Sequence, residues 1–283
     1  MRSCGMRAPE APPPPLRFRA PALMGVVNAT PDSFFSGGRT PSAGAAVERA
    51  LMLVEAGADI LDIGGRSTRP GSEPVALEVE RARVIPVITA LAKKVKVPIS
   101  VDTDKSEIAA EALDAGARII NDVSALRADR RMPLIAARAE RVVLMHMQGL
   151  DPRSMQADPR YDDVVGEVKS FLIERLEAFI AAGGDRARVW VDPGVGFGKT
   201  LEHNLALIKH VGELAEVAPV LLGVSRKSFF GGIRPDGGPE DRLPGSLALA
   251  AWAGFAGVAA LRVHDVAETR SAFDALSAVA EAR

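Results

Sequence analysis

The chain has 283 residues, of which 47% are hydrophobic and 25% are charged, and its formal net charge is −1. This length and composition suit one large folded domain, and the balanced charge provides no overall field to attract nucleic acid or a membrane surface. The single cysteine, Cys4, excludes an intrachain disulfide and a cysteine-based metal site, and it is typical of a reducing cytoplasm. No apolar run reaches about 18 residues, so we expect no transmembrane helix.

The first 22 residues differ in composition from the rest. Prolines occupy positions 9, 12–15 and 21, so this segment disfavours a helix and favours extended geometry. The segment also lacks the continuous apolar stretch of a signal peptide. We therefore predict a flexible proline-rich tail over residues 1–22 and one folded domain over residues 23–283.

Eight apolar runs follow in chain order, and nearly all of them end in a polar or charged residue. The predicted strands are 24–28, 59–63, 99–102, 118–122, 142–145, 189–192, 220–224 and a last run that ends at 262–264. The predicted helices, which carry apolar residues at three- and four-residue spacing, are 43–56, 78–93, 106–115, 164–182, 201–214, 246–257 and 267–280. The alternation predicts a parallel sheet, and the eightfold count predicts an α/β fold of the TIM (β/α)₈ barrel type with its site at the carboxyl ends of the strands.

A short internal repeat supports this register. Residues 56–62 (AGADILD) are echoed by residues 115–121 (AGARIIN) and more loosely by residues 256–262 (AGVAALR). In each copy a glycine that can end a helix precedes a buried strand, and a polar residue follows five positions later. The repeat predicts equivalent heights in the barrel for Asp62, Asn121 and Arg262.

The polar residues at the strand ends form two candidate groups. Asp102, Asn121 and Asp192 together present acceptors and donors that match a planar heterocycle with an amidine-like edge, such as a pterin. Each of them alone is more often a helix cap or a core hydrogen-bonding group, but three at strand ends favour a site. The second group is cationic and predicts a phosphate site at the loops after strands two, seven and eight, with surface ion pairs as the alternative. It comprises Arg69, Lys227, Arg262 and His264.

Two further features bear on ligands. Asn28, at the end of the first strand, offers an oxygen that suits Mg²⁺ together with waters and phosphate oxygens. Residues 194–200 (GVGFGKT) look like a phosphate-binding loop, but Pro193 stands where that motif requires its first glycine. We expect this loop instead to pass close beneath a flat ligand, with the Phe197 ring against it.

The chain resembles the dihydropteroate synthase family over about residues 23–270. The residues that carry the resemblance are the blocks 24–34 (MGVVNATPDSF), 64–71 (GGRSTRPG), 121–124 (NDVS), 192–199 (DPGVGFGK), 225–228 (SRKS) and 262–265 (RVHD). The resemblance implies a pterin-binding TIM barrel of folate biosynthesis. Its reaction condenses dihydropterin-methyl diphosphate with 4-aminobenzoate and releases dihydropteroate and diphosphate.

The resemblance also implies roles for individual residues. The implied catalytic residues are Lys227, Asp102, Asp192 and Arg69. The implied pterin contacts are Thr68, Asp102, Asn121, Asp192, Phe197 and Lys227. The implied diphosphate contacts are Asn28, Arg69, Arg262, Val263 and His264, with Mg²⁺ as cofactor at Asn28. The implied slot for 4-aminobenzoate, which sulfonamides also occupy, comprises Phe34, Pro70, Lys227 and Ser228. Members are usually homodimers, so we expect a cytoplasmic homodimer.

Two positions depart from the family pattern. Arg66 replaces the usual glutamate after the double glycine, and Phe35-Ser36 replaces the usual Ser-Asp of the first loop. These replacements keep open a non-catalytic homologue that only binds pterin. A pterin-binding methyltransferase domain is a second alternative, although the diphosphate set counts against it because methyl transfer involves no diphosphate.

Overall fold

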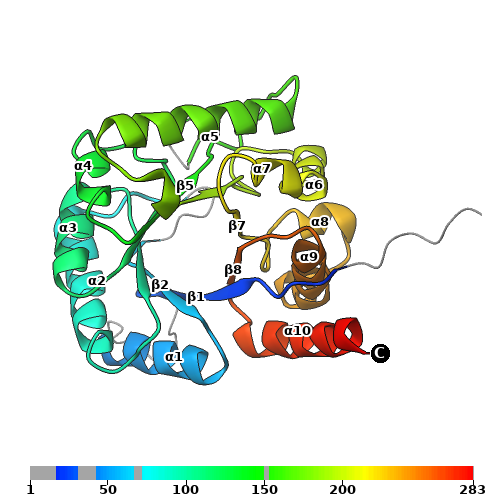
Figure 1. Ribbon diagram of the computed structural model, residues 1–283, viewed down its shortest axis with the longest axis horizontal. Helices are drawn as coiled ribbons and strands as arrows, with labels where there is room; N and C mark the ends of the chain where they lie inside the picture. Colours follow the sequence, from blue (N-terminus) through cyan, green and yellow to red (C-terminus); the bar gives the residue numbers. More distant parts are fainter. Residues whose placement is uncertain (1–16, 31–42, 67–71, 150–152, 283) are drawn as a thin grey trace, which may run out of the picture.

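The computed structural model describes residues 17–30, 43–66, 72–149 and 153–282. Eight parallel strands form one sheet in the order β6-β5-β4-β3-β2-β1-β8-β7. A parallel bridge between Val191 and Val220 brings the two ends of this order together, so the sheet is a nearly closed barrel. The helices lie around the outside of the strands (Figure 1). The predicted TIM (β/α)₈ fold is confirmed.

The elements alternate along the chain as the sequence pattern predicts. The strands are β1 Ala22–Asn28, β2 Ile60–Gly64, β3 Ile99–Asp102, β4 Ile119–Asp122, β5 Arg141–Met145, β6 Val189–Asp192, β7 Leu221–Leu222 and β8 Ala260–Val263. The helices are α1 Ala43–Glu55, α2 Leu77–Leu91, α3 Ser106–Asp114, α4 Met132–Ala136, α5 Val164–Ala181, α6 Leu201–Lys209, α7 Val211–Leu214, α8 Phe230–Ile233, α9 Leu243–Phe255 and α10 Val266–Glu281.

Two local predictions were wrong, and two short helices were missed. The strand predicted over residues 220–224 is only two residues long, Leu221–Leu222. Val220 and Val224 are buried and apolar as strand residues are, but they lie outside the continuous ladder of backbone hydrogen bonds. The single helix predicted over 201–214 is interrupted at His210, where φ is −102° and ψ is 18°. The short helices α4 and α8 were not predicted, because segments of this length carry too little periodicity to be recognised.

The folded part of the chain begins earlier than the predicted boundary at residue 22. Ala22 is already in β1, and the Phe18 ring packs edge-on against Phe255 and Phe273, with centroids 5.3 and 5.5 Å away. The backbone N–H of Arg19 also donates to the carbonyl of Gly254. Residues 17–22 therefore attach the chain to α9 and α10, and only residues 1–16 of the predicted tail lie outside the described residues.

Two layers of side chains fill the barrel, and alternation along the strands separates them. The lower layer is an apolar cluster of Met24, Ile60, Ile119, Val143, Trp190, Leu221 and Ala260. Side chains in a strand alternate in direction, so the residue two positions later also faces inward. Two residues after Ile60, Ile119, Trp190 and Ala260 come Asp62, Asn121, Asp192 and Arg262. The apolar layer is thus the floor beneath a polar layer toward the carboxyl ends of the strands.

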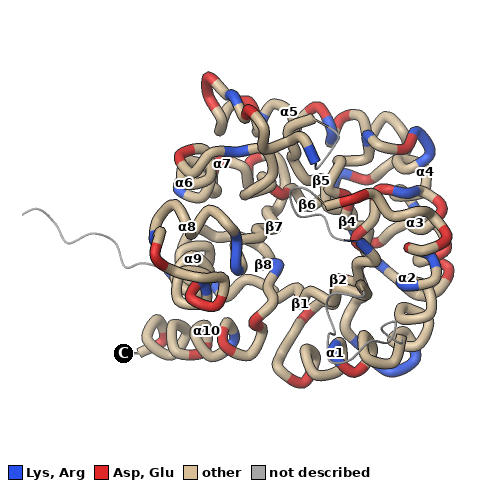
Figure 2. Tube along the Cα trace, turned by 180° about the vertical axis from the view of Figure 1, so that it is seen from behind, with Lys and Arg blue, Asp and Glu red and all other residues tan. Residues whose placement is uncertain are grey.

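The larger apolar core lies between the strands and the surrounding helices. It includes fully buried Phe179 of α5 and Phe273 of α10 together with the outward faces of the strands. Among the described residues, no helix combines the length and apolar character needed to span a membrane. Acidic and basic residues are interspersed along the outer helices (Figure 2).

We predict that Phe18→Ala lowers the free energy of unfolding by about 2 kcal/mol, because the ring fills a site between α9 and α10. This is less than the roughly 3–5 kcal/mol typical of a fully buried phenylalanine, since Phe18 is only partly buried. Urea unfolding followed by circular dichroism measures the change. Val279→Ala on α10, where the side chain is 75% exposed, is the control. Equal effects of the two substitutions would contradict the packing role of Phe18.

Candidate functional site

The polar layer contains a buried ion-pair network. Arg262 of β8 donates from Nε to Asp62 Oδ2 at 2.6 Å and from Nη2 to Asp102 Oδ2 at 2.8 Å. Asn121 Nδ2 donates to the same oxygen of Asp62 at 3.2 Å. The network joins β2, β3, β4 and β8 across the barrel. Asp62, Asn121 and Arg262, which were predicted to lie at equivalent heights, thus meet in one layer of the barrel.

Asp102 retains an acceptor that the protein does not use. Its Oδ1 is buried and accepts no hydrogen bond from any described residue, and the same holds for Oδ1 of Asp62. Burial raises the pKa of Asp102 to about 7, although Arg262 and Arg66 favour the charged form. Two buried carboxylate oxygens without donors suit a ligand that carries N–H groups.

Asp192 lies at the same level, at the end of β6. Its Oδ1 accepts a hydrogen bond of 2.7 Å from the backbone N–H of Gly194, and burial raises its pKa above the ordinary value. Gly223, after β7, has no side chain to fill the space beside the Asp192 carboxylate. A Cβ on this glycine would stand 4.0 Å from both Asp192 Oδ2 and Arg262 Cβ. Asp192 and Asp102 therefore border the same polar layer, from strands three places apart in the strand order.

The glycine-rich loop after β6 is fixed by β5 and by the segment that follows it. Gly194 has φ of +66°, and a Cβ there would come within 1.8 Å of the His146 carbonyl oxygen, so only glycine fits. Gln156 Nε2 donates to the Gly196 carbonyl, and the Tyr161 hydroxyl donates to the Gly198 carbonyl. These contacts fix the backbone of the loop, and its passage beneath a flat ligand stays a prediction.

Lys199 is the most deeply buried lysine of this loop region. Its Nζ donates to the Phe197 carbonyl at 3.0 Å and to His146 Nδ1 at 2.9 Å. Burial lowers the pKa of Lys199 to about 7, with Asp192 opposing and Lys227 adding to the shift. Burial, together with Lys199, also holds the pKa of His146 far below its ordinary value, so the imidazole is neutral and accepts at Nδ1.

The loops after β7 and β8 are interlocked. Arg226 donates from Nε and Nη2 to the two carboxylate oxygens of Asp265, both at 2.7 Å. The backbone N–H of His264 donates to Ser225 Oγ at 3.2 Å, and its Nδ1 lies 3.1 Å from that oxygen. Lys227 directly follows these two anchored residues, Ser225 and Arg226, and its Nζ lies 4.5 Å from the centroid of the Phe197 ring. The cation–π contact brings Phe197 and Lys227 together as one wall of the site.

The predicted site residues divide into three groups. Asp102, Asn121 and Arg262 are brought into one network, and Asp192, Phe197 and Lys227 border it. Asn28 and Val263 end β1 and β8, His264 directly follows β8, and Ser228 lies in the loop after β7. Phe34, Ser36, Thr68, Arg69 and Pro70 lie outside the described residues. The individual contacts with substrates stay predictions.

Sequence reasoning missed three buried residues in or beside the polar layer. Asp62 was recognised as a strand end but not as a partner of Arg262, although its position two residues after Ile60 in a strand indicates the inward face. Lys199 and His146 were not assigned to the site. Lysine is rarely buried, and nothing in the sequence predicts a contact between residues 53 positions apart.

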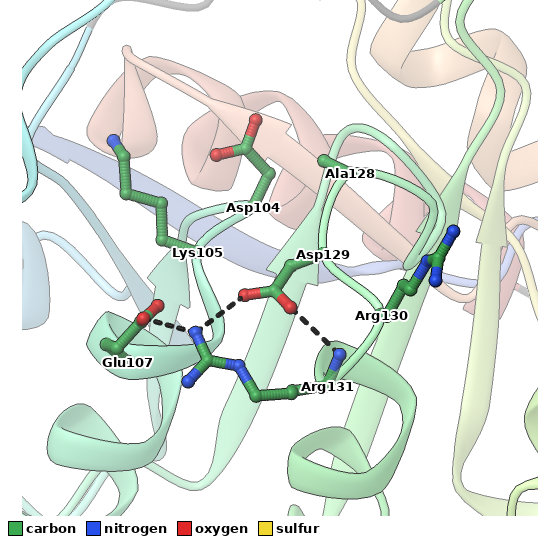
Figure 3. Close-up of a pocket in the computed structure, with 7 residues that line it drawn as sticks. All are labelled: Asp104, Lys105, Glu107, Ala128, Asp129, Arg130 and Arg131. Atoms are coloured by element: carbon green, nitrogen blue, oxygen red, sulfur yellow. Dashed lines mark hydrogen bonds and ion pairs between the residues drawn. The ribbon is translucent and has the colours of Figure 1, made fainter.

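A separate surface pocket of about 500 Å³ lies beside the starts of α3 and α4 (Figure 3). It is lined by Asp104, Lys105, Glu107, Ala128, Asp129, Arg130 and Arg131. Arg131 pairs with both Glu107 and Asp129, and Lys105 pairs with Glu80. Because its acidic and basic side chains are balanced, this pocket favours neither an anionic nor a cationic ligand. The candidate site is therefore the barrel mouth, where buried carboxylate oxygens lack donors.

The chain is similar to known proteins over nearly its whole length. The model of the pterin binding enzyme family matches residues 24–264. The dihydropteroate synthase of Escherichia coli (strain K12) is 44% identical over 264 residues, which cover 93% of each chain. The structure of Xanthomonas albilineans dihydropteroate synthase with 4-aminobenzoic acid superposes with a TM-score of 0.86 at 47% identity, covering 93% of this chain and 94% of that one.

A second structure of the Xanthomonas albilineans enzyme, in complex with 7,8-dihydropteroate, gives a TM-score of 0.83 at 44% identity and covers 93% of this chain and 95% of that one. Each of these relatives matches 93% of this chain. The chain belongs to the dihydropteroate synthase family of pterin-binding enzymes.

Proposed function

We propose that this chain is a dihydropteroate synthase, a transferase that condenses dihydropterin-methyl diphosphate with 4-aminobenzoate and releases dihydropteroate and diphosphate. The observation that carries this proposal is the polar layer of the barrel, in which Asp102 keeps a buried acceptor without a donor. A pterin offers several N–H donors on one edge, which match Asp102, Asp192 and the amide of Asn121. The relatives named dihydropteroate synthase support the same substrates.

The proposed reaction begins with loss of diphosphate from the pterin methylene group. The carbon–oxygen bond breaks, and the positive charge that develops on the pterin is stabilised by Asp102 and Asp192. Arg262, Val263 and His264 bind the departing diphosphate together with Arg69. The neutral amine of 4-aminobenzoate then forms the new carbon–nitrogen bond and releases a proton. Lys227 contacts both substrates, and Phe34, Pro70 and Ser228 complete the aminobenzoate slot.

A Mg²⁺ ion is compatible with the residues at the barrel mouth. Asn28 ends β1 with a half-buried amide. In the described part of the chain, no group of three or more His, Cys, Asp or Glu side chains could hold a metal on its own. Mg²⁺ is commonly bound by one or two protein oxygens plus substrate phosphates, so Asn28 fits an ion that arrives with the diphosphate. When bound, the ion neutralises charge on the leaving diphosphate.

The same proposal includes a homodimer, which the exposed apolar side chains of Ile233 on α8 and Trp252 on α9 support. Light scattering coupled to size-exclusion chromatography measures the mass, and a monomer at micromolar concentration would contradict it. The cytoplasmic location stays a prediction.

The experiment that tests the proposed function combines the purified protein with dihydropterin-methyl diphosphate, 4-aminobenzoate and Mg²⁺. We expect dihydropteroate and diphosphate in equal amounts. Pterin binding without product would instead support the non-catalytic homologue. Methyl transfer from methyltetrahydrofolate to a corrinoid protein would support the methyltransferase domain.

Asp192→Asn is expected to abolish measurable pterin binding. The substitution replaces a charged carboxylate, which only accepts, by an amide that carries an N–H₂ donor. This donor would face the N–H donors of the ligand, so a hydrogen bond is lost. Isothermal titration calorimetry measures the affinity, and Asp185→Asn, a change to an aspartate that caps the turn before β6, is the matched control. Unchanged pterin affinity in Asp192→Asn would remove this residue from the pterin site.

Lys199→Met is expected to raise KM for the pterin substrate about tenfold, with a smaller effect on kcat. The substitution leaves the Phe197 carbonyl and His146 Nδ1 without their donor, which costs about 1–3 kcal/mol for each buried group. The Phe197 ring then loses its fixed position beside Lys227. Lys209→Met on the exposed face of α6 is the control. A kcat and KM indistinguishable from the control would exclude this role for Lys199.

Removal of Mg²⁺ with a chelator is expected to stop product formation, and Asn28→Ala is expected to raise the Mg²⁺ concentration for half-maximal rate by about tenfold. Asn28 supplies the only protein oxygen assigned to the ion. Its removal therefore takes away a large part of the binding free energy that the protein contributes to the ion. Steady-state rates at varied Mg²⁺ measure it. An unaltered Mg²⁺ dependence in the variant would show that Asn28 is not a ligand.

A further inference from the structure

Arg226, in the loop after β7, has a backbone conformation that is costly for an arginine. Its φ is +53°, in the left-handed region where the Cβ of any residue other than glycine crowds its own backbone. Such a conformation persists only where surrounding contacts hold it. The next residue is Lys227, which the proposed function places against both substrates. The direction in which the chain leaves Arg226 therefore decides where Lys227 lies.

The beginning of α9 binds both backbone groups of Arg226. The Arg226 N–H donates to Ser246 Oγ at 2.9 Å, and its carbonyl accepts from Arg242 Nη1 at 3.3 Å. Asp265, after β8, binds the guanidinium of Arg226 with both carboxylate oxygens. The backbone and the side chain of this residue are thus held from two different elements, as a strained residue requires.

Ser246 is oriented to accept the backbone N–H. The residue is only 6% exposed, and its hydroxyl donates to the Arg242 carbonyl, four residues earlier, at 2.7 Å. Because the hydroxyl proton is used in that bond, a lone pair of the oxygen is free to accept from Arg226. Arg242 in turn donates to Arg226, so the three residues form a closed ring of hydrogen bonds.

The beginning of α9 is itself packed against the segment that follows Lys227. A Cβ on Gly245 would lie 2.6 Å from Phe230 Cε1, so this glycine lets the helix lie directly against the ring. The Phe230 ring stacks on Phe229 with centroids 4.6 Å apart, and both residues are buried. The backbone N–H of Phe230 also donates to the Lys227 carbonyl at 3.3 Å. The chain on both sides of Lys227 is therefore tied to α9.

We infer that Ser246 is a positioning residue, which holds Arg226 in the left-handed conformation and thereby directs Lys227 and Ser228 to the slot for 4-aminobenzoate. This inference rests on the proposed function, because that function assigns both residues to the slot. The pterin differs, since in the proposed function most of its contacts come from the ends of β3, β4 and β6. Loss of the Ser246 contact is therefore expected to weaken binding of 4-aminobenzoate more than binding of the pterin.

The variants Ser246→Ala, Ser246→Thr and Thr269→Ala separate this role from a general loss of stability. Thr269 is the matched control because it is 3% exposed and its hydroxyl also donates to the carbonyl four residues earlier, that of Asp265, at 2.7 Å. In Thr269→Ala the Arg226 N–H keeps Ser246 as its acceptor. Both alanine variants are expected to lower the free energy of unfolding measured in urea.

Steady-state rates at varied concentrations of each substrate distinguish the variants. Ser246→Ala is expected to raise KM for 4-aminobenzoate about tenfold, because a backbone donor loses its acceptor, and to change KM for the pterin substrate by less than about threefold. Ser246→Thr keeps the hydroxyl and is expected to retain the wild-type values. Thr269→Ala is expected to match the wild type in both KM values.

A crystal structure of Ser246→Ala tests the cause directly and needs no substrate. The φ of Arg226 is expected to become negative, and Lys227 Nζ is expected to leave its place 4.5 Å from the centroid of the Phe197 ring. With its acceptor gone, nothing compensates the Arg226 N–H for the strained conformation.

An unchanged φ of Arg226 in Ser246→Ala would overturn the inference, and so would equal increases in KM for the two substrates. Equal kinetic effects of Ser246→Ala and either Ser246→Thr or Thr269→Ala would overturn it as well. A wild-type protein that makes no dihydropteroate would instead overturn the proposed function. The crystal structure would then still decide whether Ser246 holds Arg226.

Discussion

The site depends on one constraint, which is the burial of three aspartates in the same layer of the barrel. Asp62, Asp102 and Asp192 are each nearly inaccessible to solvent, and isolated carboxylates in such a position are costly. Arg262 offsets two of them by donating to Asp62 and Asp102 at once. In the proposed function, the acceptors that remain unused after this pairing recognise a donor-rich ligand. The proposal thus assigns substrate binding to the same groups that form the network of the barrel interior.

The same constraint explains why the surrounding loops are so firmly tied. Mobile loops above a layer of buried charges would admit water, which would screen the interactions between these charges. The surroundings keep a low dielectric constant only if the loops are fixed. The Arg226–Asp265 pair joins the loops after β7 and β8, and Lys199 joins the loop after β6 to β5. These ties converge on Phe197 and Lys227, which face each other at the edge of the layer. The sequence blocks that distinguish the family thus include residues that hold the loops as well as residues placed to touch substrate.

Much of this arrangement could be predicted from sequence, and the failures have physical causes. Strand ends were predictable because buried parallel strands appear as continuous apolar runs, as in residues 60–64 and 189–192. Partner choice was not predictable: Arg262 was grouped with the phosphate-binding cations, whereas in the structure its hydrogen bonds go to the acidic residues. The burial of Lys199 likewise depends on Tyr161 and His146, which the fold brings to it from a distant part of the chain.

The central claim is that the polar layer formed by Asp102, Asn121 and Asp192 recognises the pterin. The most direct measurement is a crystal structure of the protein with a dihydropterin bound. The account predicts the N–H edge of the pterin within hydrogen-bonding distance of the Asp102 and Asp192 carboxylates, with the Arg262 guanidinium beside it. A pterin bound outside the barrel mouth, or inside it with its N–H edge turned away from both carboxylates, would contradict the account.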